Sequence, residues 1–312
     1  PLIIGGVPSP AGQDATVLVA RANANGTFNY CTATMVAPNL ALTARHCVSN
    51  ADLTAACDVS GRTLSGGEIG ADFEPASLNV FTGPARPPGV LPPDAIRADQ
   101  WSPAARGVTI FHDRSDRLCA HDLALLLLDR PLSTPIASLR LDGDAKAGEG
   151  ATVIGWGIVN DRATGYEPPG RQTRDVEVFN VGPQQTQQLV LTAAELSLRG
   201  ESICEGDSGG PVMARDSGAV IGVVSRGDNQ LGGPGLPKGA SCVGPGEYNV
   251  ATKLSPFRAV FDRAFAAAGA QPRPEVRADG EGGICDCRVG GDPTDTLSAV
   301  LVSLFWLLRV RR

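Results

Sequence analysis

The stretch Cys204-Glu205-Gly206-Asp207-Ser208-Gly209-Gly210-Pro211 places one serine among three glycines. A serine hydroxyl is a weak nucleophile at neutral pH and needs an adjacent base to take its proton. The flanking glycines allow a tight turn that would point the backbone N–H groups of Gly206 and Ser208 at one spot, where an oxyanion could form. A glycine-rich turn that merely contains a serine is the alternative, but a string of this length favours a nucleophile.

Three histidines are available to act as the base. His46 follows a short apolar run and precedes Cys47, a cysteine that could pin it. His112 and His121 lie among charged residues and are expected at the surface. His46 is therefore the predicted base.

Asp122 comes directly before the apolar run 123–128, so a carboxylate stands at the mouth of a predicted buried strand. A lone aspartate in this position usually belongs to a turn or cap. Together with His46 and Ser208, however, it supplies an orienting acid, and the three residues occur in the chain order His, Asp, Ser.

The rest of the chain predicts an all-β fold with one helix. Glycine (38 residues) and proline (24 residues) are abundant, and short apolar runs alternate with turn residues from residue 3 to about 254. These runs are too short for helices, and examples are 41–44, 123–128, 151–154, 189–191 and 220–224. The proline-rich stretches 84–93 and 232–237 are expected as surface insertions.

One amphipathic helix is predicted over residues 255–268. Ser255 is a good N-cap, Pro256 suits the first helical position, and Gly269 suits the end. Its apolar face has helical spacing and consists of Phe257, Val260, Phe261, Ala264 and Phe265.

Composition limits the function classes. The chain has 312 residues and a net charge of −6, which argues against nucleic acid as a partner because phosphates require a basic surface. Eight cysteines are present, none in a zinc-type pair, and we expect neither a metal nor a cofactor. Six cysteines lie in the body, an even number that suits an oxidising compartment. We interpret Pro1 as the processed end of an exported protein.

These motifs resemble the chymotrypsin-like serine protease family. The matching strings occur in the family's order and are 3–6 (IIGG), 43–47 (TARHC), 122–126 (DLALL), 155–157 (GWG), 204–211 (CEGDSGGP) and 224–227 (VSRG). The resemblance implies two six-stranded antiparallel β-barrels with a C-terminal α-helix, and a cleft between the barrels that holds the site. It implies peptide-bond hydrolysis through an acyl-enzyme on Ser208, with His46 as base, Asp122 as its orienting acid, and Gly206 and Ser208 as the oxyanion hole. The Arg of TARHC, where the family usually has Ala, is expected to be exposed and neutral in effect.

Domain boundaries follow from the same resemblance. The protease domain is predicted over 3–268, with the first barrel at about 3–132, the second at about 150–254 and the helix at 255–268. Residues 269–284 are expected as a linker and 285–312 as a separate tail.

The resemblance also implies disulfides and an activation step. Cys31–Cys47 would brace the histidine loop, and Cys204–Cys242 would brace the primary specificity pocket. Cys57–Cys119 remains by elimination, with free buried thiols as its alternative.

In the family a freed N-terminal Ile turns inward and its ammonium pairs with the Asp before the nucleophile, here Ile3 and Asp207. Leu2 precedes Ile3 in place of a basic residue, so we expect a zymogen-like form that is activated at Leu2–Ile3.

The specificity pocket is assigned by the same route. Ser202 would form its floor, where an Asp would select Lys or Arg, and Ile203 would add apolar lining. Gly227 and Gly246 map to the walls, and Ser225 is a further substrate-binding candidate. Cleavage is expected after uncharged or apolar residues. Two departures, Arg226 in place of the usual Trp and a long Gly/Pro loop before Cys242, would remodel the rim.

The tail contains Cys285-Asp286-Cys287, an apolar run over 297–308 and three arginines near the end. As a helix the run rises only about 18 Å, short of the roughly 30 Å hydrocarbon core. The arrangement resembles myxobacterial-type sorting signals, which implies lipid modification at Cys285 or Cys287 and contact with a membrane and a sorting enzyme. An ordinary amphipathic helix with a CxC disulfide is the alternative.

Two alternatives to an active protease stay open. One is a non-catalytic binding module on a protease fold, and the other is a zymogen that needs an external activator. In the main interpretation the partners are protein or peptide substrates and protease inhibitors. The expected location is extracytoplasmic, either free or attached to the outer cell surface.

Overall fold

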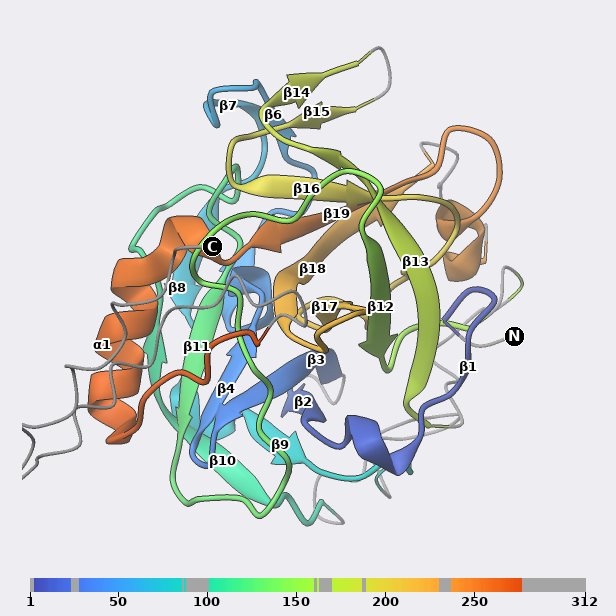
Figure 1. The fold of residues 1–312 in the computed structure, drawn as a ribbon. Coiled ribbons are helices and arrows are strands. Elements are labelled where there is room, and N and C mark those ends of the chain that lie inside the picture. The colour runs from blue at the N-terminus through green and yellow to red at the C-terminus, as the bar shows by residue number, and fades with distance from the viewer. Residues whose placement is uncertain are drawn as a thin grey trace, which may run out of the picture. The chain divides into compact units, whose positions relative to one another are not determined.

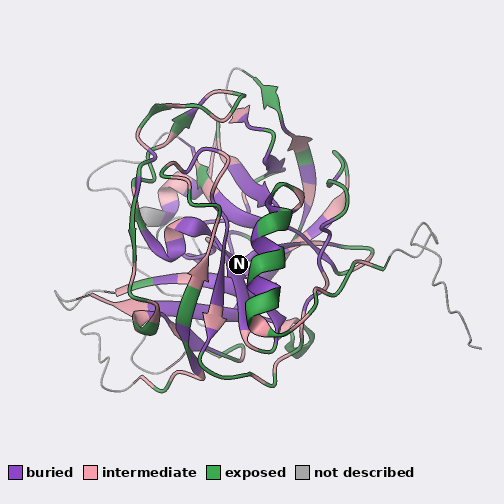
Figure 2. Cartoon of the chain, turned by 90° about the vertical axis from the view of Figure 1, so that its left-hand side faces the viewer, coloured by how far each residue is buried: buried purple, intermediate pink, exposed green. Residues whose placement is uncertain are grey.

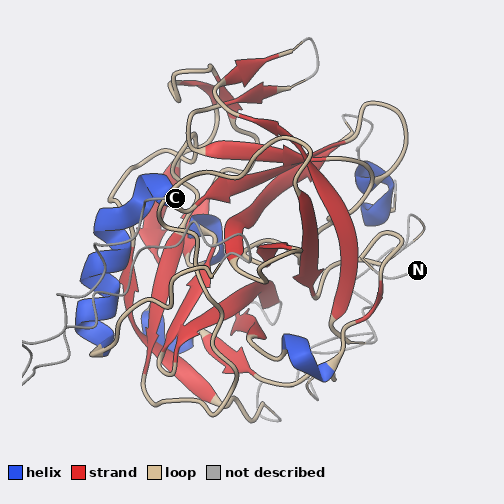
Figure 3. Ribbon diagram, viewed as in Figure 1, coloured by secondary structure: helices blue, strands red, loops and turns tan. Residues whose placement is uncertain are grey.

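Short strands joined by turns make up most of the structure (Figure 3). The computed structural model describes residues 3–23, 28–85, 87, 101–159, 162, 170–186, 189–229 and 237–276. The tail with Cys285, Cys287 and 297–308, and most of the two proline-rich stretches, lie outside these residues. Within the described chain, no helix has the length and apolar character needed to cross a membrane.

Six antiparallel strands close the first barrel (Figure 1). Around the barrel they run β10 (Ala105–Phe111), β11 (Ala124–Leu128), β4 (Leu40–Thr43), β3 (Phe28–Ala37), β2 (Thr16–Ala22) and β9 (Asn79–Phe81). β4 is buried along its whole length and β11 almost so, because one face of each fills the barrel and α1 (Arg258–Ala268) packs on the outside. Because both faces of β11 are buried, the run 123–128 is continuously apolar and does not alternate between apolar and polar residues.

The second barrel also has six antiparallel strands. They run β13 (Gln172–Val181), β12 (Gly150–Gly155), β17 (Pro211–Ala214), β18 (Val220–Asp228), β19 (Tyr248–Lys253) and β16 (Glu195–Leu198), and β16 pairs back to β13. The fold prediction of two six-stranded barrels with a C-terminal helix is confirmed. One detail differs: β1 (Val7–Pro8) adds to β13 of the second barrel, although its residues precede the first barrel in the chain.

The other strands form small pairs outside the barrels. These are β5 (Ser49–Ala51) with β8 (Ile69–Asp72), β6 (Ala56–Cys57) with β7 (Thr63–Ser65), and β14 (Gln184–Gln185) with β15 (Val190–Leu191). Single 3₁₀ turns occupy η1 (Ala11–Gln13), η2 (Arg45–Cys47), η3 (Pro75–Ser77), η5 (Lys238–Cys242) and η6 (Ser255–Phe257).

The C-terminal helix α1 lays its apolar face on the first barrel and exposes the opposite face (Figure 2). All five residues of the predicted apolar face are buried, and Gly269 ends the helix with φ 65°. The start differs from the prediction, because η6 precedes α1 and Ser255 caps no helix N–H group. Its hydroxyl donates instead to Asp144, a partner that local sequence does not reveal.

Three disulfides link the described cysteines. They are Cys31–Cys47, Cys57–Cys119 and Cys204–Cys242, the three predicted pairs. Each lies at a different loop, so the histidine loop, the 57–67 hairpin and the Ser202 loop are all covalently held.

Candidate active site

His46 sits in the η2 turn that follows β4, and the Cys31–Cys47 disulfide ties this turn to β3. The pairing of β4 with β11, which sets Thr43 opposite Ala124, brings Asp122 beside the histidine. The imidazole Nδ1 lies 2.9 Å from Asp122 Oδ2, and the His46 backbone N–H donates to Oδ1 at 3.0 Å. Two contacts to one carboxylate fix both the ring and the backbone of the histidine.

Asp122 is buried, with 4% of its surface exposed. Ser225 on β18 donates its hydroxyl to Asp122 Oδ2 at 2.6 Å. Burial opposes ionisation, but the facing His46 and the hydrogen bonds from His46 and Ser225 outweigh it and hold the pKa of Asp122 below its usual range. An ionised Asp122 keeps a proton on Nδ1, which leaves Nε2 as the basic nitrogen.

Ser208 lies on the turn before β17 of the second barrel. Its carbonyl accepts the Thr32 N–H of the first barrel at 2.8 Å, which joins the two barrels at the nucleophile. Ser208 and His46 line one cleft of about 250 Å³ between the barrels, together with Gly206 and Tyr30. The structure therefore gathers the three predicted residues His46, Asp122 and Ser208 at one place.

The glycines around Ser208 are required by their surroundings. Gly206 has φ 100°, and a Cβ there would lie 2.5 Å from the Tyr30 ring. Gly209 has φ 81°, and a Cβ would lie 2.1 Å from the Thr43 hydroxyl. Within the described chain, the N–H groups of Gly206 and Ser208 have no protein acceptor, so both are free to bind an oxyanion.

Asp207 turns away from the cleft into the second barrel and is 1% exposed. Its carboxylate accepts the Gly157 N–H at 2.8 Å and the Cys204 N–H at 3.0 Å. Burial raises its pKa to about 7, although the two backbone hydrogen bonds lower it in part. No described cation pairs with it. A Cβ at Gly155 would lie 2.1 Å from this carboxylate, which accounts for the glycine.

Ile3, the predicted partner of Asp207 after activation, is fully buried in the core of the second barrel. The hydrogen bonds found for the described residues do not join Ile3 to Asp207. The nitrogen of Ile3 belongs here to a peptide bond with Leu2 and carries no charge.

Two of the predicted pocket residues, Ser202 and Ile203, directly precede Cys204 of the Cys204–Cys242 disulfide. Ser202 is fully buried, and its hydroxyl has no hydrogen-bond partner among the residues that the structure describes. A Cβ at Gly227 would lie 3.5 Å from Ile203 and 2.7 Å from the Asn249 side chain, so Gly227 and Ile203, both predicted pocket residues, are neighbours. Gly246 has φ 83° and lies near the Asn229 carbonyl. Ser225 was a further substrate-binding candidate. In the structure its hydroxyl donates a hydrogen bond to Asp122.

Arg45 contradicts the expectation of an exposed residue. It is 4% exposed and binds Asp72 and Ser49, and Ser49 also donates to Asp72 at 2.9 Å. His112 lies 3.2 Å from the other oxygen of Asp72. The ion pair between the buried Arg45 and the exposed Asp72 fastens the η2 turn to β8, and its sequence signal was an arginine where the family has alanine.

Comparison with known proteins identifies the family. The sequence model of the trypsin family matches residues 3–72 and 97–260, and the chain belongs to that family. It is 26% identical over 240 residues to a trypsin from Saccharopolyspora erythraea, covering 75% of this chain and 90% of that protein.

A second relative is glucanase inhibitor protein 3 from Phytophthora infestans, at 23% identity over 75% of this chain and 83% of that protein. Among solved structures, mouse neuropsin, a serine protease expressed in the limbic system of the brain, superposes with a TM-score of 0.54. The match covers 83% of this chain and 98% of neuropsin, and at 14% identity it shows the fold alone.

Proposed function

We propose that the chain is a serine endopeptidase that cleaves peptide bonds through an acyl-enzyme on Ser208. The observation that carries this proposal is the position of His46, held by Asp122 on one side and lining the same cleft as Ser208 on the other. Membership of the trypsin family supports it.

In the proposed reaction, His46 Nε2 takes the Ser208 proton as the hydroxyl oxygen attacks the substrate carbonyl. The carbonyl oxygen becomes an oxyanion, which the free N–H groups of Gly206 and Ser208 bind. The imidazolium then gives its proton to the leaving amine, and water hydrolyses the ester by the same steps in reverse. Asp122 stabilises the imidazolium, because Ser225 and His46 keep its carboxylate ionised.

Substrates with an uncharged or apolar side chain before the scissile bond fit best. The proposed floor, Ser202, carries no charge that could pair with Lys or Arg. Ile203 supplies an apolar neighbour to Gly227, 3.5 Å from where a Cβ at that glycine would lie.

Cleavage of the Leu2–Ile3 bond is the proposed activation step. It would create an ammonium on Ile3 that can pair with a buried carboxylate, Asp207, whose partners within the described ranges are the backbone N–H groups of Gly157 and Cys204. Pairing would lower the pKa of Asp207 and stabilise the turn that carries Ser208. A Leu2 side chain before the bond suits an apolar pocket, so another copy of the enzyme can make this cut. The opposite case, an external activator, predicts that Ser208→Ala protein also starts at Ile3.

An extracytoplasmic location is proposed, supported by the three disulfides. Protein substrates and protease inhibitors are the proposed partners. Attachment to the outer surface through Cys285 or Cys287, with a sorting enzyme, remains a proposal from the tail's sequence.

A non-catalytic binding module is the second candidate, and the relative named as a glucanase inhibitor favours it. A fluorophosphonate probe distinguishes the two, because it reacts only with an activated serine. We expect stoichiometric labelling at Ser208, with Ser208→Ala as control. Absence of labelling in protein that starts at Ile3 would contradict the protease and leave the binding module.

A further inference from the structure

Arg226 lies on β18 directly after Ser225, the residue that binds Asp122. Its Nη1 donates to Glu195 Oε1 at 2.5 Å. Glu195 is buried, and its other oxygen accepts the Thr192 N–H at 2.8 Å. The carboxylate is thus held from two sides and in turn holds the guanidinium.

The ion pair with Glu195 leaves part of the Arg226 side chain exposed to solvent. Its side chain keeps 23% exposure, whereas the Glu195 side chain keeps 2%. Burial opposes the charge of Arg226, but Glu195, with smaller contributions from Tyr248 and Asp122, outweighs it and keeps the pKa of Arg226 above the usual range. A guanidinium has five N–H donors, and Glu195 occupies one of them.

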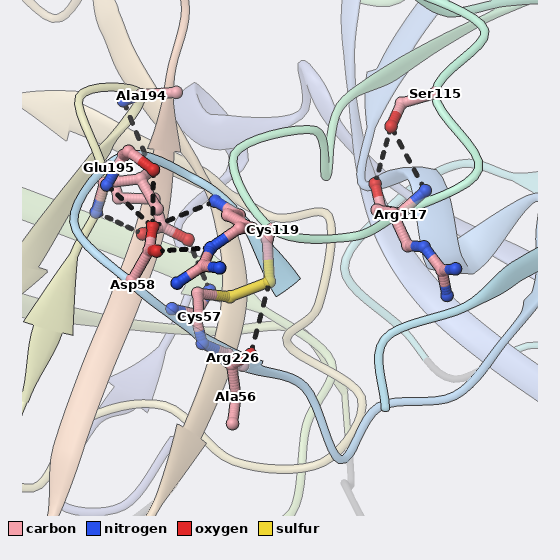
Figure 4. Close-up of a disulfide and its surroundings, with 12 residues drawn as sticks. Ala56, Cys57, Asp58, Ser115, Arg117, Cys119, Ala194, Glu195 and Arg226 are labelled. Atoms are coloured by element: carbon pink, nitrogen blue, oxygen red, sulfur yellow. Dashed lines mark hydrogen bonds and ion pairs between the residues drawn. A yellow bond between two sulfur atoms is a disulfide. The ribbon is translucent and has the colours of Figure 1, made fainter. Parts of the chain in front are cut away.

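Arg226 faces a small pocket next to the catalytic residues. The pocket is lined by His46, Leu53, Ala55, Cys57, Leu118, Cys119, Asp122, Ser225 and Arg226. Figure 4 shows Arg226 and Glu195 in the surroundings of the Cys57–Cys119 disulfide. His46 and Leu53 also line the main cleft, so the two hollows adjoin.

The same chain shows that one arginine can serve two carboxylates. Arg140 binds Glu149 through Nη1 and Nη2, and Glu275 through Nε and Nη2. Among the described residues Arg226 binds one carboxylate, that of Glu195, and it is one of the residues that line the pocket. The neighbouring anion Asp122 is already matched by His46 and Ser225.

We propose that Arg226, fixed by Glu195, forms an anion-accepting subsite that selects peptide substrates with an aspartate or glutamate near the scissile bond. This inference rests on the proposed peptidase function. The disulfide-braced wall of Cys57 and Cys119 and the buried Leu118 reduce solvent at the site, which strengthens a charge-assisted hydrogen bond.

The test uses matched peptides that differ only by Glu or Gln, placed in turn at each of four positions on both sides of the cleaved bond. At one position we expect kcat/KM to favour Glu about 10- to 100-fold. High salt should reduce the ratio of kcat/KM for the Glu peptide to that for the Gln peptide, because salt screens the partly exposed charges of Arg226 and the substrate carboxylate.

Arg226→Gln with Glu195→Gln is the key variant, because it removes both members and leaves no unpaired buried charge. It should cleave the Gln peptide nearly as well as the wild type and lose the Glu preference. Arg226→Lys keeps the positive charge but lacks the planar guanidinium, so it should retain part of the preference for the Glu peptide. A wild-type ratio of one or less at every position, or a preference that survives in the double variant, would overturn the proposal.

Binding of the same peptides to Ser208→Ala protein separates this inference from the proposed function. Tighter binding of the Glu peptide without turnover by the wild type would refute the peptidase and keep the subsite. Turnover by the wild type together with equal binding of both peptides would keep the peptidase and refute the subsite.

Discussion

Replacing Asp207 by Asn isolates the energetic effect of a buried carboxylate that accepts hydrogen bonds from the backbone N–H groups of Gly157 and Cys204. Burial raises the pKa of Asp207 from 3.8 to about 7 in the folded protein with Leu2–Ile3 intact. Between these values the folded state keeps a proton that the unfolded state has lost, so stability must fall as pH rises. About three pKa units correspond to about 4 kcal/mol in total, more than half of it between pH 5 and pH 8. The decline slows through pH 7 and has levelled off above about pH 8.

The Asn side chain has one oxygen, so it can accept only one of the N–H groups of Gly157 and Cys204. This loss costs about 1–3 kcal/mol at every pH. The net change at pH 8 is therefore small, and the informative quantity is the pH dependence. Relative to the Asp207→Asn variant, the protein with Asp207 should lose stability steadily from pH 5 to pH 7.

Urea unfolding at pH 5, 6, 7 and 8 measures this, in a Ser208→Ala background that prevents self-cleavage. Asp216→Asn, an exposed aspartate on the turn after β17, is the matched control. Parallel pH curves with and without the Asp207→Asn change would refute the reasoning, since they would mean that Asp207 is already ionised and paired before activation.

Three further predictions concern the site. Asp122→Asn should lower kcat about 10⁴-fold by stabilising the wrong imidazole tautomer, and a loss under tenfold in a chromogenic assay would contradict it. Ser202→Asp should shift a peptide-library cleavage profile toward Lys and Arg, and an unchanged profile would show that Ser202 is not the pocket floor. Arg45→Ala should destabilise the protein by about 1–3 kcal/mol in urea, because Asp72 loses its buried donor, with Arg45→Lys retaining part of the stability. A change in the free energy of unfolding of less than about 0.5 kcal/mol would contradict a stabilising role for Arg45.

The barrels and the three candidate catalytic residues could be predicted because local strings carry them. The run after Asp122 is continuously apolar, and the glycines beside Ser208 occupy positions where a side chain would collide with Tyr30 or Thr43. Such constraints act at single positions and leave a mark in the sequence.

What sequence reasoning missed depends on partners distant in the chain. Asp72 lies 27 residues from Arg45, and Asp144 lies 111 residues from Ser255. The sequence around Arg45 and Ser255 does not indicate these partners. Local reasoning therefore predicts an exposed Arg45 and a Ser255 that caps the helix. Similarly, β1 joins the second barrel through a pairing with β13 that no local pattern encodes.

The formation of an acyl-enzyme on Ser208 tests the central claim most directly. Protein starting at Ile3 is mixed with an activated peptide ester that has an apolar residue before the ester bond, and intact mass is followed on the millisecond to second scale. We predict a covalent adduct on Ser208 that reaches one per molecule and then hydrolyses, with a burst of alcohol of matching size. His46→Ala should slow its formation by several orders of magnitude, and Ser208→Ala should abolish it. Turnover without an adduct, or an adduct on another residue, would contradict the mechanism.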